Sequence, residues 1–204
     1  MAPRTAVVPK MTRVEQKRAT REALIESARA LFVESGYTST TAEAIAKAAG
    51  VSRATFYLHF RSKAEIVQWH MSALEQPIRD DYRRLDAFED PSLGDVTDWL
   101  NEHALFWRAH RAEFASMEQA LSHEPLVSDE WFAMLRRVAS GMDNLLGRQS
   151  DDDARLRARL HVTSMLMSTD RNFHFALVQG HDENFERLVS VLAEQWLFCL
   201  HRTG

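Results

Sequence analysis

The chain is poor in the residues that cross-link, kink or interrupt a fold. Its 204 residues include one cysteine, five prolines and seven glycines. A single cysteine, Cys199, excludes a disulfide within the chain and is typical of a reducing compartment, so we expect a cytoplasmic location. The scarcity of proline and glycine favours long helices joined by short links.

Segments typical of membrane or exported proteins are missing as well. No apolar run approaches the roughly 20 residues that a membrane-spanning helix needs. The N-terminus is basic but lacks the apolar stretch of a signal peptide. We therefore expect no membrane partner.

Motifs for catalysis and for metal binding are absent from the sequence. The pairs His103/His110 and His174/His181 are each seven residues apart, with no cysteine or HExxH partner. No nucleophile-elbow Gly-x-Ser-x-Gly and no phosphate-binding loop occurs. The acidic run 151–153 falls at an expected helix start, where carboxylates favour the helix dipole. These patterns argue against an enzyme, and we expect no cofactor and no metal.

The overall charge of −4 hides a basic head on an acidic body. Residues 1–63 hold 11 Lys and Arg against 5 Asp and Glu, which leaves 14 against 24 for residues 64–204. The net charges are therefore +6 and −10, and phosphates attract a basic module and repel an acidic one. Residues 1–20 carry five of the basic residues and are expected to be a flexible arm. That arm is either a solvated tail or a segment that follows phosphates or enters the minor groove.

The segment from Thr40 to Lys63 predicts two short helices joined by a tight turn. Thr40 followed by Glu43 is a capping box, and the alanine-rich run after it favours a short helix. Gly50 ends that helix because only glycine enters the left-handed region without strain, and Ser52 caps the next. This is the layout of a helix-turn-helix, whose second helix enters the DNA major groove. The spacing alone also fits two core helices with a glycine turn, but the basic charge favours DNA binding.

Residues Arg21 to Lys63 resemble the TetR family of transcriptional regulators. The resemblance covers about a fifth of the chain and rests on Gly36-Tyr37, Thr40-Thr41, Ala46, Gly50-Val51-Ser52, the string Thr55 to Phe60, and Ser62-Lys63. From residue 64 on, the chain matches the family in size and helical character only. In helix spacing and Trp placement, that body is similar to the subgroup typified by the ethionamide-resistance repressor.

The resemblance implies a recognition helix at about Arg53 to Phe60. Arg53 is the expected base contact, since its fork can pair with guanine O6 and N7. Phe56 and Phe60 are expected to be core plugs. The full set of expected DNA-binding residues is Thr40, Thr41, Ser52, Arg53, Ala54, Thr55, Tyr57, His59 and Lys63.

Apolar spacing after residue 63 predicts a helical body, for an all-α protein of about nine helices. We expect the helix that begins near Lys63 to end or kink near Gln76, because Pro77 breaks the hydrogen-bond ladder. Further helices are expected at 93–109, 111–122, 126–147, 153–179 and 183–201. The expected organisation is the arm at 1–20, a DNA-binding domain at 21–66, and a ligand-binding and dimerisation domain at 67–204.

The middle helices carry aromatic stripes with polar interruptions. Such stripes are often simple core, but facing aromatic rings, pliant methionines and interspersed polar groups favour a pocket for a mostly apolar ligand. The expected ligand-binding residues are Trp99, His103, Phe106, Trp107, Phe114, Met117, Trp131, Leu135, Met142, Met165, Ser168, Asn172 and Trp196.

The last two helices are the dimer face that the resemblance implies. The expected apolar surface consists of Leu160, Leu166, Phe173, Leu177, Leu188, Leu192 and Phe198. The sequence thus predicts a homodimeric regulator, most simply a repressor that a small apolar ligand releases from a palindromic operator. The alternative is a DNA-bound adaptor or activator that a protein partner controls.

Overall fold

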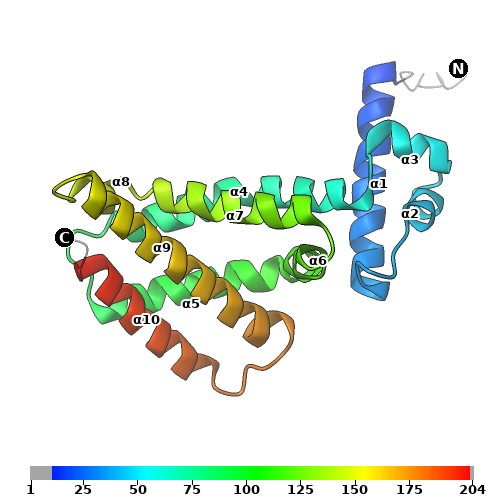
Figure 1. Cartoon of the computed structure of the whole chain (residues 1–204). Coiled ribbons are helices and arrows are strands. Elements are labelled where there is room, and N and C mark those ends of the chain that lie inside the picture. Colours follow the sequence, from blue (N-terminus) through cyan, green and yellow to red (C-terminus); the bar gives the residue numbers. More distant parts are fainter. Residues whose placement is uncertain (1–10, 203–204) are drawn as a thin grey trace, which may run out of the picture. The chain divides into compact units, whose positions relative to one another are not determined.

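The computed structural model describes residues 11–202, apart from the side chain of Arg202. These residues form ten α-helices and one π-helical turn, with no strand among them (Figure 1). The predicted all-α class is confirmed, and the helix count is close to the nine expected. The described residues divide into two compact units with the boundary between Ile66 and Val67.

The first unit contains α1 (Arg13–Ser35), α2 (Ala42–Ala48), α3 (Arg53–His59) and the first residues of α4 (Lys63–Asp86). Helix α1 begins at Arg13 because Thr12 and Glu15 form a capping box. Residues 13–20, which were expected to belong to the flexible arm, are helical. Residues 1–10 of the expected arm lie outside the described residues.

The second unit contains the rest of α4 and all later helices. These are α5 (Leu93–Ala109), α6 (Arg111–Leu121), α7 (Pro125–Ser140), α8 (Asp143–Gly147), α9 (Asp152–Phe173), the π-helical turn His174–Val178, and α10 (Phe185–Arg202). Helix α10 packs on α5 and α9, and α9 also packs on α7 (Figure 1). Between residues 11 and 202, no helix is both long enough and apolar enough to cross a membrane.

Helix α4 does not end near Gln76 as the sequence predicted. It continues through Pro77 to Asp86. Ala73, whose carbonyl loses its partner at Pro77, lies on the exposed face, where water can hydrate it. The neighbouring residues Leu74 and Ile78 are buried, and this packing holds the helix together across the proline.

Two other predicted helices are interrupted. The one expected at 126–147 ends at Ser140, and α8 then starts where Asp86 accepts hydrogen bonds from the backbone N–H groups of Asn144 and Leu145, at 2.8 and 2.9 Å. The one expected at 153–179 changes to a π-helical turn after Phe173. Arg111 donates to the carbonyl of Val178 at 2.6 Å and thereby holds the end of that turn.

Candidate DNA-binding interface and ligand-binding region

Local hydrogen bonds cap the N-terminal ends of the two helices of the predicted motif. The hydroxyl of Thr41 accepts from the N–H of Ala44 at 3.1 Å and caps α2, while that of Ser52 accepts from Thr55 at 3.0 Å and caps α3. Between them Gly50 has φ 69°, a left-handed conformation that glycine adopts without strain. The N–H of Val51 donates to the carbonyl of Ala46 at 2.9 Å, which completes the tight turn.

Helix α3 has one buried and one exposed side. Phe56 and Phe60 are fully buried, with ring centroids 5.9 Å apart, so their predicted role as core plugs is confirmed. Arg53, Ala54 and Tyr57 are exposed. The guanidinium of Arg53 lies 5.7 Å from the ring of Tyr57 and hydrogen-bonds to the Tyr57 side chain, so these two exposed residues form one group on this face.

Leu58 is an exposed residue that the sequence prediction left out. Its side chain is 79% exposed on α3, next to Tyr57. A leucine so exposed can meet a thymine methyl group without the desolvation cost of a polar side chain. The sequence could have pointed to it through the helical spacing, since position 58 is on the face opposite the plugs.

Thr40 lies inside the first unit, in contrast to the prediction that it touches phosphate. It is 3% exposed, and its hydroxyl donates to the carbonyl of Gly36 at 2.8 Å. Its N–H donates to the carbonyl of Tyr37 at 3.2 Å, so both donors are already used. The residue that caps α2 is Thr41, which is exposed and keeps its predicted place at the surface.

The side chain of Lys63 also forms its hydrogen bonds within the protein. Its ammonium donates to the carbonyls of Tyr37, Thr38 and Thr40, at 2.6, 3.2 and 2.8 Å. An ammonium has three donors, so none is left for a phosphate in this conformation. We therefore revise its predicted role, because Lys63 fixes the loop that joins α1 to α2.

Of the remaining predicted DNA-binding residues, Ser52 is exposed, whereas Thr55 and His59 are partly exposed. The hydroxyl of Thr55 lies 2.8 Å from that of Ser52, so the two form a pair at the start of α3. Burial lowers the pKa of His59, and the nearby charges of Lys17 and Arg21 add to this effect. His59 is therefore neutral at neutral pH and offers a phosphate at most one ring N–H.

In the second unit, several of the predicted ligand-binding residues form one packed group of rings. This aromatic cluster consists of Tyr82, Trp99, His103, Trp107, Phe114, Phe173 and Trp196, all buried. Trp107 and Phe114 stack with centroids 3.8 Å apart, and Trp99 and His103 stack at 5.4 Å. Phe106 extends the cluster, at 6.4 Å from His103.

The polar atoms of the aromatic cluster are satisfied within the protein. His103 Nδ1 lies 2.6 Å from a carboxylate oxygen of Asp81, and the indole of Trp107 donates to His103 Nε2 at 3.2 Å. The indole of Trp99 donates to the carbonyl of Asp81 at 3.1 Å, and that of Trp196 to the Thr169 hydroxyl at 2.9 Å. In this conformation none of these three indole groups is left to orient a ligand, so a ligand role for the cluster stays a prediction.

The other predicted ligand-binding residues are dispersed. Met117, Leu135 and Met142 are buried, and Trp131 is partly buried on α7. Asn172 donates to the carbonyl of Ser168 at 2.8 Å, within α9. Met165 and Ser168 lie at a separate cavity between the last two helices.

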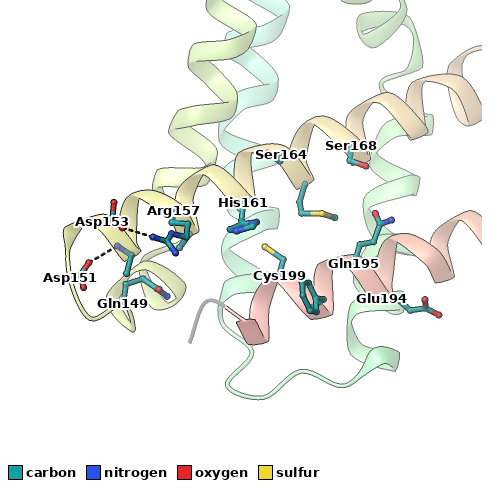
Figure 2. Close-up of a pocket in the computed structure, with 14 residues that line it drawn as sticks. Gln149, Asp151, Asp153, Arg157, His161, Ser164, Ser168, Glu194, Gln195 and Cys199 are labelled. Atoms are coloured by element: carbon teal, nitrogen blue, oxygen red, sulfur yellow. Dashed lines mark hydrogen bonds and ion pairs between the residues drawn. The ribbon is translucent and has the colours of Figure 1, made fainter.

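A groove of about 970 Å³ lies between α9 and α10 (Figure 2). Arg157 and Asp153, both on α9, form an ion pair of 2.8 Å at one end of the groove, His161 and Cys199 face its middle, and Glu194 lies at the other end. Its full lining is Gln149, Asp151, Asp153, Ala154, Arg157, Ala158, His161, Ser164, Met165, Ser168, Glu194, Gln195, Phe198 and Cys199. The groove runs along the two helices that were expected to form the dimer face.

Only part of the predicted apolar dimer surface is available. Leu160 and Phe198 are 57% and 59% exposed, whereas Leu166, Phe173 and Leu192 are buried within the protomer. Leu177 is buried too, and Leu188 is partly buried. The spacing of apolar residues did not distinguish the inner from the outer face, because both faces of these helices carry leucine. Leu156, Met167 and Val191 are further exposed apolar residues of α9 and α10.

A group of charges lies where α6, α9 and the π-helical turn meet. Burial of its carboxyl group raises the pKa of Asp170 to about 7, and the carboxylate of Glu118 adds to this shift. Arg171 donates to Glu118 at 2.6 Å. Burial lowers the pKa of His174. This part of the unit therefore changes its protonation near neutral pH.

The sequence similarity to known proteins lies mainly in the first unit. A sequence model described as "Bacterial regulatory proteins, tetR family" matches residues 24–68. The HTH-type transcriptional regulator TtgR of Pseudomonas putida is 38% identical over 76 residues, which cover 37% of this chain and 36% of that protein. The matched segments span 25% to 54% of the length of the curated relatives.

Solved structures extend the likeness in fold to most of the chain. SmeT, the repressor of the Stenotrophomonas maltophilia multidrug efflux pump SmeDEF, has a TM-score of 0.58 at 21% identity, over 90% of this chain and 91% of that one. Thermus thermophilus FadR in complex with lauroyl-CoA has a TM-score of 0.60 at 24% identity, over 88% and 93%. Residues 24–68 thus match the TetR family of transcriptional regulators, and the chain shares its fold with solved structures such as Thermus thermophilus FadR, a TetR-family transcriptional repressor. Its homologues are regulators and not enzymes.

Proposed function

We propose that the protein is a homodimeric repressor that reads a palindromic operator with α3. The observation that carries this proposal is the exposed face of α3, where Arg53, Ala54 and Tyr57 are accessible while Phe56 and Phe60 are buried. The net charge of +6 on residues 1–63 supports binding to phosphates. The proposed contacts are Thr41, Ser52, Arg53, Ala54, Thr55, Tyr57 and His59, in a DNA-binding domain that spans about 21–66.

We propose that a second copy of the chain covers the groove between α9 and α10. An exposed surface with Leu160, Phe198 and Val191 is costly to leave in water, and a symmetric partner removes it. Two-fold symmetry then presents two recognition helices to one pseudopalindromic site. Residues 67–204 serve ligand binding and dimerisation in this proposal.

The dimer is tested by the molecular mass of Leu160→Glu in sedimentation. We expect the variant to be monomeric at concentrations where the natural chain is dimeric, because a carboxylate would be buried opposite apolar groups. Leu126→Glu is the matched control, since Leu126 is 70% exposed on α7, away from the groove. Identical masses for all three proteins would contradict the proposed interface.

The regulatory signal in this proposal is a small, mostly apolar molecule that binds within residues 67–204. Fatty-acid chemistry is a reasonable starting point, because FadR, similar in fold, was solved with lauroyl-CoA. Binding would part the stacked rings of Trp107 and Phe114 and favour a conformer whose recognition helices no longer match adjacent major grooves. DNA and ligand then oppose each other with equal coupling free energy.

Release is measured by operator binding at increasing lauroyl-CoA and lauric acid, with saturation followed by tryptophan fluorescence. All five Trp lie in residues 67–204, so their emission reports on that unit. We expect operator affinity to fall as the fluorescence change saturates. If the ligand-saturated and the free protein bind the operator equally well, release by that ligand is wrong.

A second candidate function is a DNA-bound adaptor or activator controlled by a protein partner. It is favoured by the aromatic cluster, whose rings and indole groups already satisfy one another and leave little for a ligand. Retention of operator binding with every apolar ligand tested, together with capture of a partner by the exposed body, would favour this function. The cytoplasmic location and the likeness to the ethionamide-resistance repressor subgroup remain predictions.

A further inference from the structure

A second, smaller hollow lies on the body between α4 and α7. It measures about 480 Å³ and is lined by Arg79, Ala133, Arg136, Arg137 and Ser140. Three of these five residues are arginines, although acids outnumber bases by 24 to 14 in residues 64–204. A concentration of positive charge on an acidic body is unusual enough to need a physical reason.

The acidic neighbours of this hollow neutralise only part of its charge. Arg137 forms a bidentate pair with Glu75, at 2.7 and 2.8 Å, and a further bond of 2.6 Å with Glu130. Arg79 reaches the same Glu75 carboxylate only at 3.9 Å. Arg136 forms no ion pair with any described residue and lies 5.3 Å from the ring of Phe132. Three cations therefore face two carboxylates.

Arg79 adds an unsatisfied donor to this excess charge. Its Nε is enclosed and has no hydrogen-bond partner among residues 11–202. An enclosed donor without an acceptor is destabilising, and more so when it is charged. One of its terminal nitrogens lies beside Gly141, at the C-terminal end of α7, where the helix dipole favours a cation. The dipole explains where the guanidinium lies but gives the Nε hydrogen no acceptor.

We propose that this hollow binds the phosphate group of a small phosphorylated molecule. A phosphate offers several acceptor oxygens, so it can meet the Arg79 and Arg136 guanidinium groups and the Ser140 hydroxyl together. Arg137 is already held by Glu75 and Glu130 and acts as a fixed positive charge that needs no rearrangement. The site uses none of the residues of the groove between α9 and α10, so it stands independently of the proposed dimer and of the proposed apolar ligand.

The experiment is calorimetric titration of the full chain with sodium pyrophosphate, at low ionic strength. Loss of one charge-assisted hydrogen bond is worth about 1.5–3 kcal/mol, or roughly a 10- to 100-fold change in Kd. We expect Arg79→Gln and Arg136→Gln each to weaken binding by about ten-fold or more. Arg83→Gln is the matched control on α4, because Arg83 is exposed, pairs with Asp80 at 3.0 Å and does not line the hollow. We expect it to leave the Kd unchanged.

Titrations with other anions decide whether the hollow prefers phosphate. Inorganic phosphate should bind through the same two arginines, and acetate should not compete. Absence of pyrophosphate binding up to about 10 mM, equal weakening by Arg83→Gln, or acetate binding as tightly as pyrophosphate would each overturn the proposal. A loss of duplex DNA affinity in Arg79→Gln and Arg136→Gln, without pyrophosphate binding to the natural chain, would assign these arginines to DNA. Because Arg136 is exposed, its replacement keeps the test valid even if Arg79→Gln fails to fold.

Discussion

Replacing Lys63 by methionine separates a structural role from a DNA-binding role. Methionine keeps most of the apolar stem but removes the ammonium that holds the carbonyls of Tyr37, Thr38 and Thr40. The hydrogen bonds to Tyr37 and Thr40 are partly buried, so those two carbonyls lose a partner that water does not fully replace. At about 1–2 kcal/mol for each, the first unit should lose about 2–4 kcal/mol of unfolding free energy.

The assay must report on the first unit alone. Hydrogen exchange of the α2 and α3 amides does so, because exchange measures local opening free energies. We expect faster exchange there in Lys63→Met, with the α9 and α10 amides unchanged. Lys47→Met is the matched control, since Lys47 is an exposed lysine of α2. It should leave exchange as it is in the natural chain.

Salt titration of DNA binding by Lys63→Met provides the result that would refute this role of Lys63. If Lys63 contacts phosphate, the slope of log K against log salt for DNA binding falls by about 0.9 on its removal. Unchanged exchange together with that fall in slope would show that the ammonium leaves its carbonyls for DNA, and our revision of its role would be wrong.

Three other predictions test separate parts of the account. Arg53→Ala should lose about 1–3 kcal/mol of discrimination at one base position, measured by competition between operator variants, and unchanged discrimination would remove Arg53 from the base contacts. Leu160→Glu should be monomeric in sedimentation, with Leu126→Glu dimeric. Asp170→Asn should alter the pH dependence of stability. The pKa of Asp170 is about 7 in the folded protein, and its ordinary value is 3.8. The stability that Asp170 contributes is therefore complete below pH 3.8 and is lost as the pH rises from there to about 7. The shift corresponds to at most about 4 kcal/mol. Urea unfolding from pH 4 to 8 should show that the unfolding free energy of the variant depends less on pH than that of the natural chain. The contribution of His174 is common to both proteins. Parallel pH profiles would contradict the assignment to Asp170.

Local signals in the sequence predicted the first unit well. Gly50 has the left-handed φ that its place in the turn required, and Ser52 caps α3 as expected. Phe56 and Phe60 are buried where their spacing put them. These features depend on residues within one turn of each other, which is why the sequence alone reveals them.

Two details of the first unit depend on packing that the sequence spacing did not predict. The spacing of Thr40 and Glu43 fitted a capping box. In the structure the Thr40 hydroxyl donates to the carbonyl of Gly36, and the residue that caps α2 is Thr41. Lys63 meets carbonyls 23 to 26 residues away in the chain. Only the packing of α1, α2 and α4 determines these partners.

The aromatic stripes show a different limit. Spacings of three and four residues predict that Trp99, His103 and Trp107 share a face, and they do share one cluster. The same spacing fits a filled core and an open pocket, because it specifies a face and not what covers it. Ring separations such as the 3.8 Å between Trp107 and Phe114 come only from the structure.

The most direct test of the central claim is selection of binding sites from random duplex DNA, followed by salt titration of the selected site. We predict an inverted repeat, with affinity that falls steeply as salt rises and that depends on Arg53 at one position in each half-site. Enrichment of no sequence, or of a site that Arg53→Ala reads equally well, would contradict the claim that α3 of a dimer reads an operator.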